Sequence, residues 1–560
     1  MIFIKNKLLK SSLIVLLFLC LSVLYVYPLM RTHIIFGAGD LPYHINRIQE
    51  LMDNLKTGEW YPYLYTYHFR NTAYMLGVFY PQLTLLPYAV AGLLLKNDVD
   101  GIYIGMTFYT FLSMINMYII TRKLKRSTIQ SLLTAISYGF CTYRFINAFS
   151  RFALGEYIGM TFIPLALYGL YAVMKGERRD WPYLALGLSF TLLSHIISTF
   201  LCLCLLVIIF AVCFKGIFDK ERLNSLLLSI VFFFLCSAIF IVPFLEQLTF
   251  KKYNQPSPTF MPHFAQNLST LVLNSNSNLT SAFQVSNWWE LANIGFILLV
   301  ALTWGIFNFR KLDEIDRFLI ITGSLLFLMS TSIFPWTLGM RTPLRIIQFP
   351  FRLLELDSIL LSPIFGTMIV KTNKNLKLSN SKLIILGILF VVLPWYSGVK
   401  NLILLQNNQS NNFSNSKVYS SKSKNMTYWW LDQYTPKMTK KSFNSVVYHY
   451  AYVNNKKVVL QKLNPISNGI IIKDKKVQNQ KQIILPIAHY KNLEVYQGKS
   501  KIPIKEKDNL IMLVKTNNKP LKIKYEASAL DTISKYISIL FCLILLSYII
   551  KIEINNVKLT

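Results

Sequence analysis

The sequence predicts an α-helical, polytopic membrane protein with about twelve transmembrane helices and a small β-rich domain outside the bilayer. Of its 560 residues, 53% are hydrophobic and only 15% are charged, and the mean hydropathy is +0.40. Soluble domains carry roughly 25% charged residues. Apolar stretches of about 20 residues, the length that crosses a bilayer, recur along the chain. Residues 400–529, in contrast, are polar and rich in Lys, Asn and Ser.

The first apolar stretch covers residues 9–29 and is preceded by Lys5, Lys7 and Lys10. No small-residue cleavage site follows it, so we expect a retained helix rather than a removed signal peptide.

Five basic segments predict the topology, because Lys and Arg are enriched in cytoplasmic loops. Each joins two apolar stretches, and they are 121–126, 175–180, 215–222, 309–317 and 371–382. Placing all five in the cytoplasm puts both termini there as well. The predicted crossings are 9–29, 101–121, 127–148, 157–174, two within 183–213 joined by a tight outer turn at 194–199, 223–243, 291–308, 318–335, 354–370, 383–399 and 531–550.

Residues 75–95 are apolar but are not counted as a crossing, since a span there would move 121–126 to the outside. Pro81 and Pro87 interrupt a helix in this segment. We expect it to lie in the membrane interface or dip into it. Residues 42–56 predict a second external helix, with apolar positions three and four apart. The aromatic residues expected at headgroup depth behind it are Trp60, Tyr61, Tyr63, Tyr65 and Tyr67.

The predicted domains are a transmembrane domain at 1–399, which includes the first outer loop (30–100), an external domain at 400–529, and a last helix with a cytoplasmic tail at 530–560. Within the external domain, "SVVYHYAYV", "KVVLQKL" and "NGIIIKD" alternate with a period of two between Asn- and Lys-rich turns. This pattern predicts short antiparallel strands.

The charge and cysteine content exclude several classes. The net charge of +32 suits basic loops against anionic lipid headgroups and a basic external domain, and no nucleic-acid motif or repeat accompanies it. All seven cysteines fall in apolar stretches, without the spacing of a metal site.

Ionisable residues gather on the predicted outer side. They are Asp40 and His44 after the first crossing, Arg151 and Glu156 near the start of the crossing 157–174, His195 in the outer turn, and Arg341, Arg345 and Arg352 between two later crossings. Each has a structural explanation: Asp40 as a helix cap, an ion pair between Arg151 and Glu156, a buried His195, and arginines binding lipid headgroups. A cationic cluster at membrane depth also requires an anionic partner.

One chemistry uses all of these residue types. A carboxylate at the membrane surface can act as general base on an acceptor hydroxyl, alone or through a divalent cation such as Mg²⁺ or Mn²⁺ held by Asp40 and Glu156. Guanidinium groups can bind the phosphate of a lipid-linked donor and stabilise its charge as it leaves.

The segments "GDLPYHINRIQELMDNLKTGEWYP", "GVFYPQLTLLPY", "SYGFCTYRFINAFSRFALGEYIGMTFIPL", "LLSHIIST" and "IQFPFRLLEL" resemble the GT-C superfamily of membrane glycosyltransferases. More narrowly, the chain is similar to bacterial membrane proteins described as 6-pyruvoyl-tetrahydropterin synthase-related. The resemblance implies that Asp40 and Glu156 are the two outer-loop acids and that Arg352 is the "FPFR" arginine. Family members often carry a paired acidic motif in one of these loops, whereas each loop here offers one acid.

The resemblance implies transfer of a sugar from a polyprenyl-phosphate or -diphosphate donor, and we expect a cell-envelope glycan or lipid as the acceptor, at the outer face of a bacterial cell membrane. Two alternatives stay open. The chain could transport a lipid-linked saccharide, or it could be a non-catalytic envelope protein whose external domain binds an anionic polymer.

Overall fold

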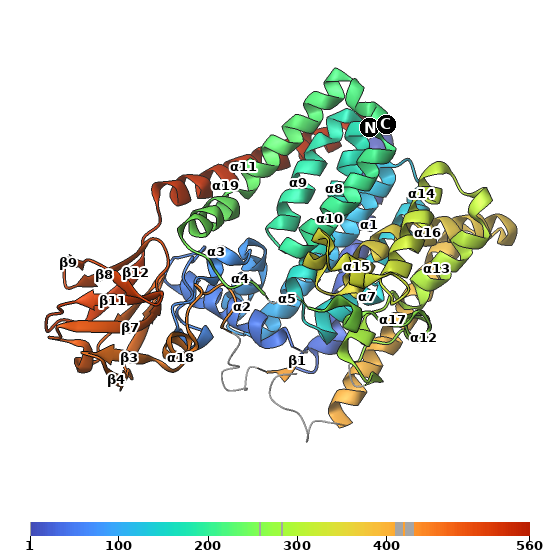
Figure 1. Ribbon diagram of the computed structural model, residues 1–560. Coiled ribbons are helices and arrows are strands. Elements are labelled where there is room, and N and C mark those ends of the chain that lie inside the picture. The colour runs from blue at the N-terminus through green and yellow to red at the C-terminus, as the bar shows by residue number, and fades with distance from the viewer. Residues whose placement is uncertain are drawn as a thin grey trace. The chain divides into compact units, whose positions relative to one another are not determined.

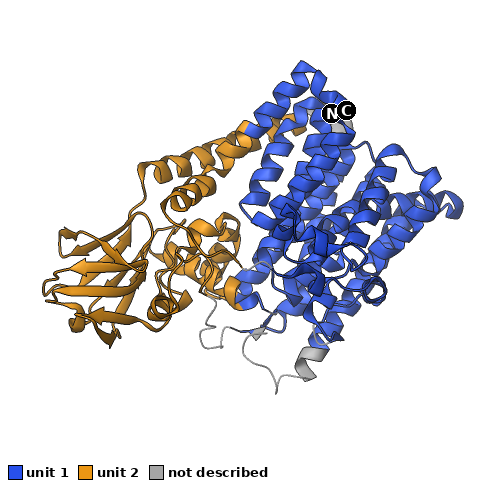
Figure 2. Ribbon diagram, in the orientation of Figure 1, with its two compact units in different colours: residues 1–41, 99–230, 258–423 blue, residues 42–98, 231–257, 424–560 orange. Residues whose placement is uncertain are grey.

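The structure is a computed structural model, and it describes residues 2–37, 39–256, 259–281, 284–408, 418–420 and 431–559. The chain divides into two compact units (Figure 2). Unit 1 comprises residues 1–41, 99–230 and 258–423, and unit 2 comprises residues 42–98, 231–257 and 424–560.

Unit 1 is almost entirely helical (Figure 1). Its main helices are α1 (Ile2–Met30), α5 (Asp98–Lys123), α6 (Thr128–Gly139), α8 (Leu154–Met174), α9 (Trp181–Leu192), α10 (Ile196–Val212), α13 (Gly295–Phe307), α14 (Glu314–Met329), α16 (Leu353–Leu376) and α17 (Asn380–Asn408). Helix α11 (Lys220–Phe250) begins in unit 1 and ends in unit 2, and α19 (Ala529–Leu559) belongs to unit 2.

In the described part of the chain, seven helices are long and apolar enough to cross a membrane: α1, α5, α8, α11, α16, α17 and α19. A multi-pass membrane protein follows from them. Helices α10 and α13 are apolar but shorter. The count of about twelve crossings and the side on which each loop lies stay predictions.

Two predicted crossings are discontinuous. Residues 127–148 do not form one helix, because α6 ends at Gly139 and a new turn begins after Cys141, whose backbone is extended. The run 183–213 breaks at Leu193–His195, between α9 and α10. This break lies one residue before the predicted outer turn.

Residues 75–95 form no helix of membrane-spanning length. The segment contains α3 (Leu76–Phe79), a short 3₁₀ turn (Leu83–Leu85) and α4 (Leu86–Leu95), which has 10 residues. Pro81 lies in the non-helical gap and Pro87 at the start of α4. Both prolines are where a ring that cannot donate a hydrogen bond is tolerated.

Helices α8 and α9 pack backbone against backbone. A Cβ atom at Gly169 of α8 would lie 2.1 Å from the amide nitrogen of Leu184, and one at Gly187 of α9 would lie 2.3 Å from that of Ala166. Glycine is required wherever two backbones approach this closely. The contact fixes α8, whose first turn carries Glu156.

Unit 2 contains two five-stranded antiparallel sheets, one with the order β10-β11-β7-β3-β4 and the other with the order β5-β6-β12-β8-β9. The strands are β3 (Tyr450–Val453), β4 (Lys456–Val459), β5 (Leu463–Ile466), β6 (Gly469–Ile472), β7 (Gln482–Ala488), β8 (Leu493–Gln497), β9 (Ser500–Ile502), β10 (Lys505–Lys507), β11 (Leu510–Val514) and β12 (Leu521–Tyr525). Buried and exposed positions alternate along β8 and β12, as the sequence pattern predicts.

The first predicted strand is wrong over half of its length. Residues 440–448 form helix α18 (Lys440–Tyr448), and only the residues from Tyr450 onward enter β3. The hydroxyl of Thr439 caps the helix by accepting the N–H of Ser442, and His449 ends it in the left-handed conformation with φ of +57°. These caps outweigh the period-two alternation, which is too short to decide between helix and strand.

Residues of the first outer loop belong to unit 2, where they pack on the β domain. Helix α2 (Leu41–Lys56) carries Glu50, whose buried carboxylate accepts the backbone N–H groups of Thr66 and His68, each at 2.7 Å. The side-chain oxygen of Asn468, in the β5–β6 turn, accepts the N–H of Tyr63 at 2.8 Å.

The aromatic tail that was expected at headgroup depth is largely buried in this unit. Tyr61, Tyr63 and Tyr65 are 2% exposed or less, and the rings of Tyr63 and Tyr525 are 5.0 Å apart. Their burial against β12 replaces the contact with lipid headgroups that the sequence predicts.

Candidate functional site

The centre of the site in unit 1 is a short irregular stretch between α6 and α8. Helix α7 (Thr142–Phe145) continues into a π-helical turn at Ile146–Ser150, closed by the Arg151 N–H donating to the carbonyl of Ile146 at 2.8 Å. Phe152 follows in the left-handed region with φ of +59°. π-Turns and such backbone conformations occur often at functional sites. Here they turn Arg151 back toward the first turn of α8.

Glu156 is held by three side chains. It is 1% exposed, its Oε1 accepts the hydroxyl of Tyr143 at 2.5 Å, and its Oε2 lies 3.3 Å from Nη1 of Arg151 and 3.6 Å from Nε of Arg352. Both carboxylate oxygens are therefore engaged, and Glu156 holds two guanidinium groups close together.

Neighbouring groups hold Arg151 in place. The Asn147 side chain accepts from its Nη1 at 2.7 Å, and its guanidinium lies 4.8 Å from the ring centre of Phe351. Glu156 and the Tyr143 hydroxyl oppose the effect of burial and raise the pKa of Arg151, so the group is permanently cationic.

Arg352 comes from the 3₁₀ turn (Pro350–Arg352) that precedes α16. Its Nη1 donates to the carbonyl of Ile347 at 2.8 Å and to Oε1 of Gln348 at 2.7 Å, and its guanidinium lies 5.0 Å from the ring centre of Phe349. Its Nε is buried and makes no hydrogen bond. A buried guanidinium donor without an acceptor is one that a ligand could satisfy.

Asp40 belongs to the same electrostatic cluster. The loop that carries it comes close to the Arg151 segment, since a Cβ atom at Gly37 would lie 2.9 Å from that of Phe152. The Asp40 side chain is open to solvent but densely surrounded by protein. Loss of hydration raises the pKa of Asp40, and the guanidinium groups of Arg151 and Arg352 oppose this rise.

His195 lies in a second hydrogen-bonded group beside the first. Its Nδ1 lies 2.8 Å from Oγ of Ser198, which in turn lies 2.9 Å from Oε2 of Glu355. His195 is 6% exposed, and Ser198 and Glu355 are fully buried. Glu355 interacts electrostatically with Glu156, Arg151 and Arg352. The second group is thereby coupled to the two arginines.

The structure does not bring three of the predicted residues into this cluster. Arg341 and Arg345 are exposed, in the segment between α14 and α16. His44 belongs to unit 2, where it is buried with its Nδ1 3.4 Å from Nη1 of Arg47.

Sequence reasoning missed Tyr143, Ser198 and Glu355. Glu355 carried a usable signal, because it is an acid in an apolar helical segment three residues after Arg352, and such acids in membrane helices are usually functional. Ser198 and Tyr143 carried none, since hydroxyl groups are common in such helices and their roles depend on tertiary contacts.

The cluster does not fit a divalent cation. No group of three or more His, Cys, Asp and Glu side chains suited to a metal occurs among the residues that the structure describes. Glu156 is flanked by two guanidinium groups, whose positive charge opposes binding of Mg²⁺ or Mn²⁺. We therefore derive no step through a metal.

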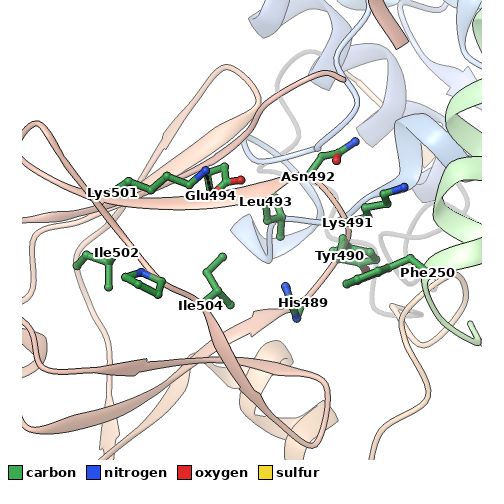
Figure 3. A pocket seen from close by; sticks show the side chains of 11 residues that line it. Phe250, His489, Tyr490, Lys491, Asn492, Leu493, Glu494, Lys501, Ile502 and Ile504 are labelled. Atoms are coloured by element: carbon green, nitrogen blue, oxygen red, sulfur yellow. Dashed lines mark ion pairs between the residues drawn. The ribbon is translucent and has the colours of Figure 1, made fainter. Parts of the chain in front are cut away.

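Two cavities lie outside this cluster. One of about 350 Å³ is in unit 2 (Figure 3), where its charged side chains are paired: Lys501 with Glu494 at 2.9 Å, and Lys491 with Glu246 at 3.1 Å. The other, of about 150 Å³, is in unit 1 and is mainly apolar, with Tyr171 among its lining residues near the C-terminal end of α8.

No family model matches the chain, and no curated protein matches it. A solved structure that is similar is the arabinofuranosyltransferase AftD from mycobacteria, determined by single-particle cryo-EM, with 12% sequence identity and a TM-score of 0.43. The match covers 69% of this chain and 26% of that one, so this chain spans about a quarter of its length. At this TM-score the likeness establishes neither fold nor activity.

Proposed function

We propose that this protein is a membrane glycosyltransferase of the GT-C type, which transfers a sugar from a polyprenyl-phosphate-type donor to a cell-envelope glycan or lipid. The observation that carries the proposal is the pair of guanidinium groups held together by Glu156 beside the solvent-accessible Asp40. Two buried cations with a single buried carboxylate between them favour an anionic ligand.

In this proposal, Arg151 and Arg352 bind the phosphate of the donor. The unsatisfied Nε of Arg352 supports this role, because a phosphate oxygen would supply its missing acceptor. The same two groups stabilise the charge that develops on the phosphate as the sugar departs. Glu156 positions the arginines and takes no proton, since both of its oxygens are engaged.

Asp40 is the proposed general base. It is the member of the cluster that solvent reaches, so an acceptor hydroxyl can reach it too. Burial raises its pKa toward the pH at which an enzyme works, which favours proton transfer. The outer location of the site rests on the positive-inside rule applied to the five basic segments.

The two alternatives have less support. A non-catalytic domain that binds an anionic polymer needs free cations, but the lysines of the cavity in unit 2 are paired with glutamates. A transporter of lipid-linked saccharide needs a polar path, whereas the cavity in unit 1 is mainly apolar.

The test is a glycan profile of the cell envelope in strains that carry wild-type protein, Asp40→Asn, or Asp432→Asn. Asp432 is an exposed aspartate of unit 2 and serves as the control. We expect the profile of the Asp40→Asn strain to match that of a deletion strain, with equal protein in the membrane. An Asp40→Asn strain with a wild-type profile would remove the proposed base.

A further inference from the structure

Glu355 differs from Glu156 in what its two oxygens contact. Oε2 accepts the hydroxyl of Ser198 at 2.9 Å, but Oε1 is buried and makes no hydrogen bond. An ionised carboxylate with an unpaired oxygen is costly in the interior, and the negative charge of Glu156 nearby adds to that cost. A proton on Oε1 removes the charge and leaves a donor in place.

The serine between Glu355 and His195 makes that proton replaceable. The hydroxyl of Ser198 has one proton and two neighbours, Nδ1 of His195 at 2.8 Å and Oε2 of Glu355 at 2.9 Å, and it can donate to only one of them at a time. When Ser198 donates to Glu355, Nδ1–H of His195 can donate to Ser198. A shift of both protons along this chain moves one proton from His195 to Glu355.

The surroundings of Glu355 contain other ionisable groups. Those that interact with it electrostatically are Glu156, Arg151, Arg352, Tyr138, Tyr143 and Cys202. The arginines are engaged by Glu156, and the hydroxyl of Tyr143 donates to Glu156. Ser198 alone provides a hydrogen bond from Glu355 toward a histidine in the described part of the cluster.

We propose that Glu355 is the general acid of this site, and that Ser198 and His195 form the relay that restores its proton. This assignment rests on the proposed function and adds a catalytic residue to it. As the bond between the anomeric carbon and the phosphate oxygen breaks, its electron pair goes to that oxygen, which takes the proton from Oε1 of Glu355. The acceptor oxygen bonds to the anomeric carbon and gives its proton to Asp40.

The relay then acts in the opposite direction to the leaving group. Ser198 passes its proton to Oε2 of Glu355 and receives one from Nδ1 of His195, which takes a proton from solvent in turn. Glu355 touches the reacting oxygen, whereas Ser198 and His195 act through it and are positioning residues.

Infrared spectroscopy of the full-length protein tests the protonation without a substrate. We expect Glu355→Gln to remove one C=O band of a protonated carboxylic acid, and Ser198→Ala to shift that band because the hydrogen bond to Oε2 is lost. Asp357→Asn is the matched control, since Asp357 is a second buried carboxyl, with no hydrogen bond at either oxygen. Its band should not respond to Ser198→Ala. No loss of a band in Glu355→Gln would show that Glu355 is ionised and would overturn the proposal.

Sugar transfer tests the catalytic role. We expect Glu355→Gln to lower the transfer rate by about 10²–10⁴-fold, the usual contribution of a general acid. Ser198→Ala should change the pH dependence of the rate, while Ser194→Ala should not, because Ser194 is a buried neighbour that bonds only the carbonyl of Phe190 at 2.6 Å. Wild-type transfer rates in Glu355→Gln would refute the acid. An absence of transfer in the wild type would instead refute the proposed function, and the infrared bands would still report the protonation of Glu355.

Discussion

The substitution Glu156→Gln tests the central ion cluster, because it keeps the size of the side chain and removes its charge. The side chains of Arg151, Glu156 and Arg352 are only 6%, 1% and 10% exposed, so water screens their interaction poorly. Without the carboxylate, two guanidinium groups face each other with no counter-charge.

Removal of one partner of a buried ion pair destabilises proteins by about 3–5 kcal/mol. We expect a loss in that range for Glu156→Gln, since its amide can still contact Tyr143 but cannot neutralise Arg151 and Arg352. The matched control is Glu314→Gln, which breaks the pair of Glu314 and Lys175, 2.9 Å apart with side chains 84% and 50% exposed. An exposed pair of this kind contributes at most about 1 kcal/mol.

The assay is unfolding of the purified protein in detergent, followed by tryptophan fluorescence, for the wild type and both variants. The free energy of unfolding should fall much more in Glu156→Gln than in Glu314→Gln. Adding Arg352→Gln to Glu156→Gln should recover part of the loss, because one of the two uncompensated charges is then gone. Equal effects of the two single substitutions would refute the claim that Glu156 compensates both arginines.

Three further predictions concern stability. Asn468→Ala should lower the free energy of unfolding of unit 2 by about 2–4 kcal/mol in denaturant titrations, since the backbone N–H groups of Tyr63 and Leu64 lose their acceptor. Burial lowers the pKa of His449 below 6.5, so the unfolded chain binds a proton that the folded chain does not, and stability should fall as the pH decreases from 6.5. His449→Asn, which suits the left-handed backbone there, should reduce this pH dependence in thermal unfolding at several pH values. Gly295→Ala should lower the melting temperature strongly, because φ is +77° and the new Cβ would lie 1.9 Å from a hydroxyl of α7.

The sequence predicted the helical elements better than their continuity. Long apolar runs such as those of α8 and α16 are decided by composition alone, and both were placed within a few residues. The break after Gly139 was missed, because the chain there is uniformly apolar and buried and gives no signal of polarity. The burial of Tyr63 against the β domain was also missed, since it depends on a contact with Tyr525 far along the chain.

The candidate site shows the same division between what sequence reveals and what tertiary contacts decide. Asp40, Arg151, Glu156 and Arg352 were visible because charged residues next to membrane spans are rare, and their electrostatic coupling makes them one cluster. Their roles were not visible, because these depend on which oxygens already have a partner.

Glu156 and Glu355 are the same residue type, and both lie in the first turn of a membrane-spanning helix. The three donors around Glu156 use both of its oxygens, so it can hold cations but has no oxygen left for a substrate proton. Glu355 has a single donor, Ser198, and one buried oxygen without a partner. Hydrogen-bond partners, rather than residue type or position in the helix, therefore separate the carboxylate that organises this cluster from the one that can exchange a proton.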